Sequence, residues 1–151
     1  CIIALNPILP TLVSVISYFE TFLWLTVVNL TKANPLFLGK IVDNHPLFQQ
    51  KEYLKKSKQQ KVEIVKTLIN SIPYSDLENK VRKLYKSAFD VEIPKDDKLT
   101  KHFKDTRNHV IHRSGYKQGD KIEIDTMIIK DLMECCDTFV DNIAKKLHID
   151  T

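Results

Sequence analysis

The sequence of 151 residues predicts an all-α fold, an antiparallel bundle of about four to five main helices with a short strand-like segment between the last two. Apolar residues recur at helical spacing through most of the chain. Only three glycines and six prolines are present, which argues against a β-sandwich or a disordered segment. Helices of this length with short connections favour antiparallel neighbours. The length fits a single helical domain, residues 1–151, with one well-buried core.

The first helix is expected to begin near Asn6-Pro7 or at Pro10, where proline suits the first turn, and to end before Asn34-Pro35. Its residues 8–30 are apolar enough to resemble a membrane span. Glu20 lies within this stretch, and a charge at the bilayer centre costs about 2.5–3.5 kcal/mol on insertion scales. A polar stripe follows the helical spacing: Thr11, Ser14, Ser17, Tyr18 and Thr21. We therefore expect a buried helix and no membrane, with a membrane helix as the alternative.

The next segments alternate between connectors and helices. Residues 35–46 read as a connector with about one helical turn, and a second helix is expected from about Pro46 to Ser71. Its core candidates are Leu54, Val62, Val65, Leu68 and Ile69. Ser75 and Glu78 have the spacing of a capping box, which predicts the start of a third helix that Pro94 terminates. The core candidates of this third helix are Leu77, Val81, Leu84, Tyr85 and Ala88.

Two further helices complete the expected bundle. Asp96 or Asp97 can cap a fourth helix that stops at Gly115 and carries Leu99, Phe103, Val110 and Ile111. The dipeptide Gly119-Asp120 and the alternation over residues 122–124 predict a turn and a short strand. Asp125 or Thr126 then begins a last helix, whose apolar side is Leu132, Cys136, Phe139, Ile143 and Leu147.

Charge and cysteine content bound the functional classes. The net charge is +4, and Glu20 is the only charged residue before Lys32, so the basic excess lies in residues 32–151. This distribution permits a nucleic-acid partner. Cys1 and the adjacent pair Cys135-Cys136 give neither a disulfide framework nor a CxxC spacing, which predicts a cytoplasmic, reducing setting. Because the chain opens with Cys, a fragment of a longer protein is one expectation.

The densest chemistry lies in the last turns of the fourth helix. Arg107-Asn108-His109-Val110-Ile111-His112 places a fixed cation, an amide and two imidazoles within about one and a half turns. Asn108 and His112 are four apart, so they share a face and can hydrogen-bond. Arg107 and His112 are about 140° apart around the axis, so Arg107 must curl back or complete its site across a dimer axis. The nearby cations Lys101, Lys104 and Arg113 make this helix end a basic cluster.

Several chemistries compete for these residues. His102, His109 and His112 fall within about 80° on a helix, with Asp105 nearby, so zinc is a rival. No HExxH run or matching ligand cluster accompanies them, and we expect no metal and no cofactor. Gly-x-Ser-x-Gly and Gly-rich phosphate loops are also absent. A histidine could instead take the proton of a ribose 2′-hydroxyl while a guanidinium stabilises the phosphorane, or both could merely bind a nucleotide.

The motif resembles the signature of the HEPN family (higher eukaryotes and prokaryotes nucleotide-binding domain). That signature is Arg, a polar residue that is often Asn, three or four further positions and then His, and Arg107 to His112 fit it. A trailing glycine, here Gly115, is typical of several branches. Residues 18–23, Tyr-Phe-Glu-Thr-Phe-Leu, are similar to the aromatic-x-Glu-x-x-Leu pattern in helix one of defence-associated branches. The resemblance covers roughly residues 8–147.

The resemblance implies a helical bundle that dimerises and brings two Arg-His motifs together across a cleft. Catalytic members are metal-independent endoribonucleases, many of them in toxin–antitoxin, abortive-infection or antiviral systems. On this chain His112 would be the general base or acid, Arg107 the phosphate ligand and Asn108 the orienting residue, with Glu20 in support. We expect RNA contacts from Lys101, Lys104, His109 and Arg113. The expected partners are RNA, a second copy, and an antitoxin or partner domain. The alternative is a non-catalytic nucleotide-binding, RNA-binding or dimerisation module of a larger protein.

Overall fold

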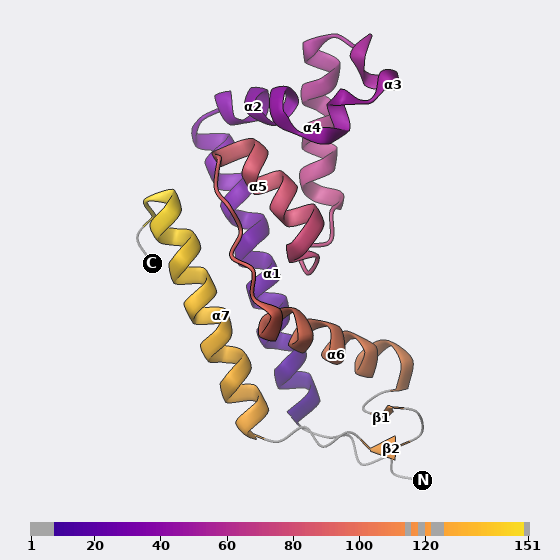
Figure 1. Ribbon diagram of the computed structural model, residues 1–151, viewed down its shortest axis with the longest axis vertical. Helices are drawn as coiled ribbons and strands as arrows, with labels where there is room; N and C mark the ends of the chain where they lie inside the picture. Colours follow the sequence, from indigo (N-terminus) through magenta and orange to yellow (C-terminus); the bar gives the residue numbers. More distant parts are fainter. Residues whose placement is uncertain (1–7, 114–115, 118–119, 122–125, 150–151) are drawn as a thin grey trace. The chain divides into compact units, whose positions relative to one another are not determined.

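The computed structural model describes residues 8–113, 116–117, 120–121 and 126–149, and within them the side chains of residues 8–9 and 106–121 are not described. The predicted all-α helical bundle is confirmed (Figure 1). The helices along the chain are α1 (Ile8–Ala33), α2 (Leu36–Asn44), η1 (Pro46–Gln49), α3 (Lys51–Leu54), α4 (Lys58–Ser71), η2 (Leu77–Val81), α5 (Arg82–Phe89), α6 (Asp97–Arg113) and α7 (Thr126–Leu147). Between α6 and α7, the two-residue strands β1 (Tyr116–Lys117) and β2 (Asp120–Lys121) pair antiparallel.

The short strand-like segment predicted between the last two helices is confirmed at residues 116–117 and 120–121. Tyr116 pairs with Lys121, and Lys117 pairs with Asp120. The alternation over residues 122–124, which predicted this strand, falls outside the described residues.

The chain falls into two compact units, and each draws on distant parts of the sequence. The first unit consists of Cys1–Phe19 and Asp96–Asn142, and the second of Glu20–Lys95 and Ile143–Thr151. The helices α1 and α7 each contribute to both units. The helix α6, whose backbone carries the predicted Arg-His motif, belongs to the first unit.

Three aromatic rings form the centre of the first unit. The Phe19 ring on α1 meets Phe103 on α6 and Phe139 on α7, each with ring centroids 5.2 Å apart and an edge-to-face orientation. Further buried residues in this unit are Leu12, Leu99, Leu132 and Cys136. The α1 and α7 segments run in the same direction here (Figure 1), which their long separation in sequence allows.

The start of α6 follows the sequence prediction. The Asp96 carboxylate accepts a hydrogen bond from the Leu99 backbone N–H at 2.9 Å, and the helix begins at Asp97. A side chain of this type satisfies one of the amide groups that every helix leaves unpaired at its N-terminus. Leu99 and Phe103 are both buried, as predicted from their spacing.

The second unit is held by buried apolar residues and by hydrogen bonds to α1. The Tyr85 hydroxyl on α5 donates to the Leu23 carbonyl at 2.8 Å, and the Trp24 indole donates to the Asn70 side chain on α4 at 3.0 Å. The core predicted for the third helix is confirmed, since Leu77, Val81, Leu84, Tyr85 and Ala88 are all buried. Other buried residues of this unit are Leu23, Val27, Ile41, Phe48, Val65, Ile69 and Tyr74.

Helix α1 has the polar face that its sequence predicts. The five residues of the predicted stripe are all exposed: Thr11, Ser14, Ser17, Tyr18 and Thr21. Among the described residues, Pro10–Ala33 of α1 is the one stretch long and apolar enough to cross a membrane, by length and composition alone. Core helices of soluble proteins can have the same length and apolar composition, so the absence of a membrane stays a prediction.

The predicted second helix is wrong as a single element. The structure divides residues 46–71 into η1, α3 and α4, and the expected connector before them contains the nine-residue α2. The physical cause is a capping box at Ser57: the Gln60 N–H donates to the Ser57 hydroxyl at 3.2 Å, and the Ser57 N–H donates to the Gln60 side chain at 2.9 Å. Leu54, expected in the core, is 57% exposed on the short α3.

The capping box predicted at Ser75 is also wrong. The helical segment begins at Leu77 with a wide π-type turn, in which the Val81 N–H donates to the Asp76 carbonyl at 3.0 Å. Asp76 precedes this turn and makes no side-chain cap. The hydrogen bond of this wide turn spans five residues, whereas the hydrogen bonds of an ordinary α-helix span four, so the helix begins without a side-chain cap.

We predict that Phe19→Ala lowers the free energy of unfolding by about 3–5 kcal/mol, because the variant leaves a cavity between two buried rings. Chemical denaturation of the wild type and the variant measures the difference. The matched control is Tyr18→Ala, since Tyr18 is adjacent, aromatic and 78% exposed, and its loss should change stability by no more than about 0.5 kcal/mol. Equal effects of the two substitutions would contradict the central role of the Phe19 ring.

Candidate functional site

The Arg-His motif lies on one uninterrupted helix. The backbone of Arg107 to Arg113 forms the last turns of α6, as the sequence predicts. Asn108 and His112 are therefore about one turn apart along the same helix. The side chains of the predicted catalytic residues Arg107, Asn108 and His112 lie outside the described residues. Their contacts, including the predicted Asn108–His112 hydrogen bond, stay predictions.

The earlier turns of α6 carry described polar side chains. Lys101 and Lys104, two of the predicted RNA contacts, are exposed and lie three residues apart on this helix. The other two predicted contacts, His109 and Arg113, fall among the side chains that are not described. The exposed part of α6 is thus cationic before the motif begins.

The His102 side chain contacts the last helix, α7. Its Nε2 lies 2.8 Å from one carboxylate oxygen of Asp131 on α7, and the other oxygen accepts a hydrogen bond from the Lys98 ammonium. The bonds from Lys98 and His102 hold the pKa of the Asp131 carboxyl below its ordinary value. The same bond with Asp131 raises the pKa of Lys98. This trio links the motif helix to α7 inside the first unit.

Sequence reasoning did not find Asp131. It lies 29 residues from His102, and a single aspartate on the polar side of a helix carries no signal of its own. The one available hint is its place beside the buried Leu132, at the border between the apolar and polar sides of α7.

One group of described residues has metal-ligand chemistry. The candidate ligand atoms of His102, Asp131 and Cys135 all lie within 4.8 Å of one another. The Lys98 ammonium already occupies this carboxylate and would repel a cation. Burial and the neighbouring carboxylates raise the pKa of the Cys135 thiol, so without a metal ion this thiol is protonated at neutral pH. We therefore assign the group a structural role.

The neighbouring Cys136 has little nucleophilic character. Burial raises the pKa of the Cys136 thiol to about 12, so it stays protonated at neutral pH. The structure thus agrees with the prediction that this cysteine packs in the core of the last helix.

Glu20, the predicted supporting residue, is half-buried on α1. Because the side chains of Arg107 and His112 are not described, a contact between Glu20 and the motif stays a prediction.

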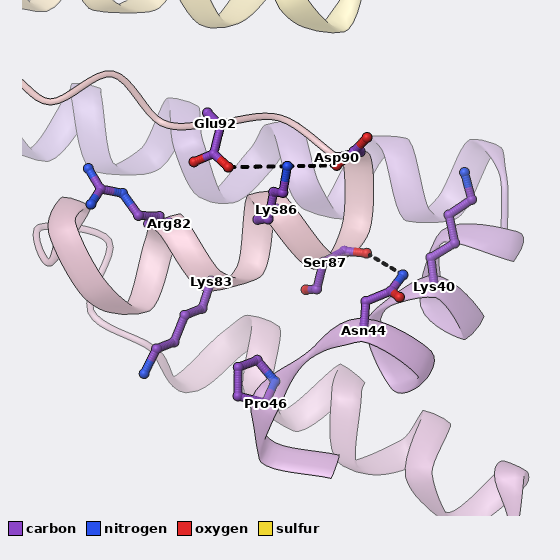
Figure 2. Close-up of a pocket in the computed structure, with 9 residues that line it drawn as sticks. All are labelled: Lys40, Asn44, Pro46, Arg82, Lys83, Lys86, Ser87, Asp90 and Glu92. Carbon is purple, nitrogen blue, oxygen red and sulfur yellow. Dashed lines mark hydrogen bonds and ion pairs between the residues drawn. The ribbon is translucent and has the colours of Figure 1, made fainter. Parts of the chain in front are cut away.

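The second unit contains a cavity of about 660 Å³ that sequence reasoning missed (Figure 2). Its lining residues come from α2, α5 and the segment after each: Lys40, Asn44, Pro46, Arg82, Lys83, Lys86, Ser87, Asp90 and Glu92. The Lys86 ammonium lies 2.8 Å from Asp90 and 3.1 Å from Glu92, as the dashed lines in Figure 2 mark. Asp90 ends α5 in the left-handed conformation, with φ 55°.

Comparison with known proteins adds no relative. No protein-family model, no curated protein and no solved structure matches the chain. The functional proposal therefore rests on the residues of the motif, their resemblance to a family signature and the geometry of α6.

We predict that Asp131→Asn destabilises the protein at pH 7, and that this effect shrinks as the pH falls below about 4. A carboxyl whose pKa is lowered by folding stabilises the protein above its unfolded pKa and loses that contribution when it is protonated. Thermal unfolding of both proteins between pH 2.5 and 7 tests the prediction. The control is Asp137→Asn, an exposed carboxylate on the same helix. A difference between wild type and Asp131→Asn that persisted unchanged at pH 2.5 would contradict it.

Proposed function

We propose that this protein is a metal-independent endoribonuclease in which Arg107 and His112 act on an RNA phosphate. The observation that carries the proposal is the continuity of α6, which holds the whole motif on one helix. The resemblance to the HEPN signature supplies the reaction class. The proposal places RNA and a second copy of the chain as partners.

The first unit supports such a role by anchoring α6. Phe103 packs against Phe19, and His102 bonds to Asp131, so two turns of the helix are held from two sides. Because catalytic groups act best when their supporting residues are fixed, an anchored helix is a suitable carrier for Arg107 and His112. The exposed Lys101 and Lys104 add positive charge along the same helix, which favours approach of a phosphate backbone.

In the proposed reaction the His112 imidazole takes the proton of a ribose 2′-hydroxyl. The 2′-oxygen forms a bond to phosphorus, the bond from phosphorus to the 5′-oxygen breaks, and the leaving oxygen receives a proton. The Arg107 guanidinium stabilises the charge on the pentacovalent phosphorus, because its planar fork matches phosphate oxygens. Asn108 orients His112 through a hydrogen bond across one helical turn.

Two copies of the motif serve this reaction better than one. A single Arg-His pair five residues apart does not readily reach both sides of a scissile phosphate, whereas two pairs facing each other across a dimer axis do. One His112 then removes the 2′-proton while the other protonates the leaving oxygen. We place the protein in the cytoplasm, in a toxin–antitoxin, abortive-infection or antiviral system, with an antitoxin or partner domain as regulator.

We predict that the purified protein cleaves RNA in the presence of EDTA, and that His112→Ala slows cleavage by about 10²–10⁴-fold through loss of the general base. Arg107→Lys should also be strongly impaired, since an ammonium lacks the planar fork. His109→Ala should be milder. The measurement is the cleavage rate of total RNA, followed by defined oligonucleotides. The matched control is His148→Ala, an exposed histidine after α7, which should cut at the wild-type rate.

A second control uses the substrate. RNA with 2′-O-methyl at the scissile position should bind but resist cutting, because the attacking hydroxyl is blocked. Equal activity of wild type and His112→Ala on every RNA would instead favour the non-catalytic binding module. Activity that disappeared with EDTA and returned with zinc would favour the rival histidine metal site.

We also predict a two-fold dimer, with the last turns of α6 at or near its interface. Light scattering at micromolar concentration should give a mass of about two chains, because the composite site needs both motifs. A monomer under these conditions would refute the composite site and leave the fold unaffected.

A further inference from the structure

We propose that the cavity of the second unit binds a small molecule that carries a phosphate group on a hydroxylated sugar. The residues that line it come from α2, the first residue of η1, α5, and Asp90 and Glu92 after α5 (Figure 2). Its volume of about 660 Å³ falls within the range of about 300–1,000 Å³ that is usual for small-ligand sites. The residues of this cavity belong to the second unit, whereas the Arg-His motif belongs to the first.

The charges of the lining residues favour an anion. Four cationic side chains line the cavity: Lys40, Arg82, Lys83 and Lys86. Lys86 is compensated by its two carboxylate partners, Asp90 and Glu92. Arg82 and Lys83 form no ion pair among the residues that the structure describes. Two positive charges from the first turn of α5 therefore stand beside the cavity without a negative partner.

The Arg82 side chain is the lining group that points most specifically to a bound ligand. Its Nε is buried and has no hydrogen-bond partner in the described structure. A buried donor without an acceptor is costly, and native proteins seldom leave one unless something else satisfies it. A phosphate oxygen is a suitable acceptor, because guanidinium groups bind phosphates through two parallel N–H bonds.

The carboxylates of Asp90 and Glu92 indicate that the ligand also carries hydroxyl groups. Asp90 and Glu92 would repel a molecule that is anionic throughout, but they can accept hydrogen bonds from hydroxyl groups. Asn44 adds a polar amide, whose N–H group donates to the Ser87 carbonyl at a long 3.5 Å. A phosphate at Arg82, with sugar hydroxyls toward the carboxylates, uses both kinds of group, and Lys83 adds a second positive charge to the lining. Sugar phosphates and nucleoside phosphates share this chemistry.

The test is calorimetric titration of the protein with ribose 5-phosphate and, separately, with AMP. We expect binding of at least one of them, weakened roughly tenfold to a hundredfold in Lys83→Gln and in Arg82→Ala, since each loses a charge-assisted contact. Arg82→Lys keeps the charge and is the safer variant for folding, and it should also bind more weakly. Lys56→Gln, an exposed lysine of the same unit outside the cavity, should bind like wild type.

The two ligands distinguish the source of the phosphate. Equal affinities would identify a sugar-phosphate site, whereas tighter binding of AMP would identify a nucleoside phosphate. His112→Ala should bind both like wild type, so the outcome is separate from that of the ribonuclease proposal. The inference is overturned if neither compound binds at millimolar concentration, or if the Arg82 and Lys83 variants bind as well as wild type. It is also overturned if these variants weaken only the binding of an RNA oligonucleotide.

Discussion

The edge-to-face contacts of Phe19 with Phe103 and Phe139 are the constraint on which the first unit depends. One ring from α1 meets one ring each from α6 and α7, and all three are buried. Apolar burial of this kind is strong but weakly directional, so it brings the helices together without fixing their rotation. The hydrogen bonds of the Asp96 cap and those of Asp131 with His102 and Lys98 are directional. They fix the rotation of α6, which the aromatic contacts leave free. The proposed catalytic groups sit at the far end of the helix held in this way.

The second unit combines a well-packed core with one buried side-chain nitrogen that has no hydrogen-bond partner among the described residues. Tyr85 illustrates the satisfied case, because its buried hydroxyl donates to the Leu23 carbonyl. Arg82, only three residues earlier, illustrates the other, since its buried Nε lacks a partner. Proteins usually tolerate such a group where binding later compensates it. Tyr85 and Arg82 lie on the same helix and differ in one respect: the Tyr85 hydroxyl has a hydrogen-bond partner within the protein and the Arg82 Nε has none. We therefore treat Tyr85 as structural and Arg82 as a candidate ligand contact.

Several features set by nearby residues could be predicted from the sequence, whereas those set by distant residues could not. The start of α6 at Asp97, the apolar side of α7 and the core of the third predicted helix depend on spacing and caps within a few residues. The cap at Ser57 and the false one at Ser75 have the same type of motif, and only the surrounding fold separates them. The bond between His102 and Asp131 and the cavity lined by Lys40 and Arg82 join residues 29 to 42 positions apart. No local pattern reports such pairs. The motif itself was found because its residues are adjacent, while its side-chain geometry stays a prediction.

The discontinuous make-up of the first unit has a consequence for synthesis. A ribosome makes the chain from its N-terminus, so Phe19 emerges long before Phe103 and Phe139, its two packing partners. Until residue 139 has left the exit tunnel, α6 has no complete support, although its Arg-His motif has already been made. A chain interrupted before α7 would thus carry the motif on a helix that keeps the Phe19–Phe103 contact but lacks the bonds of His102 and Lys98 to Asp131.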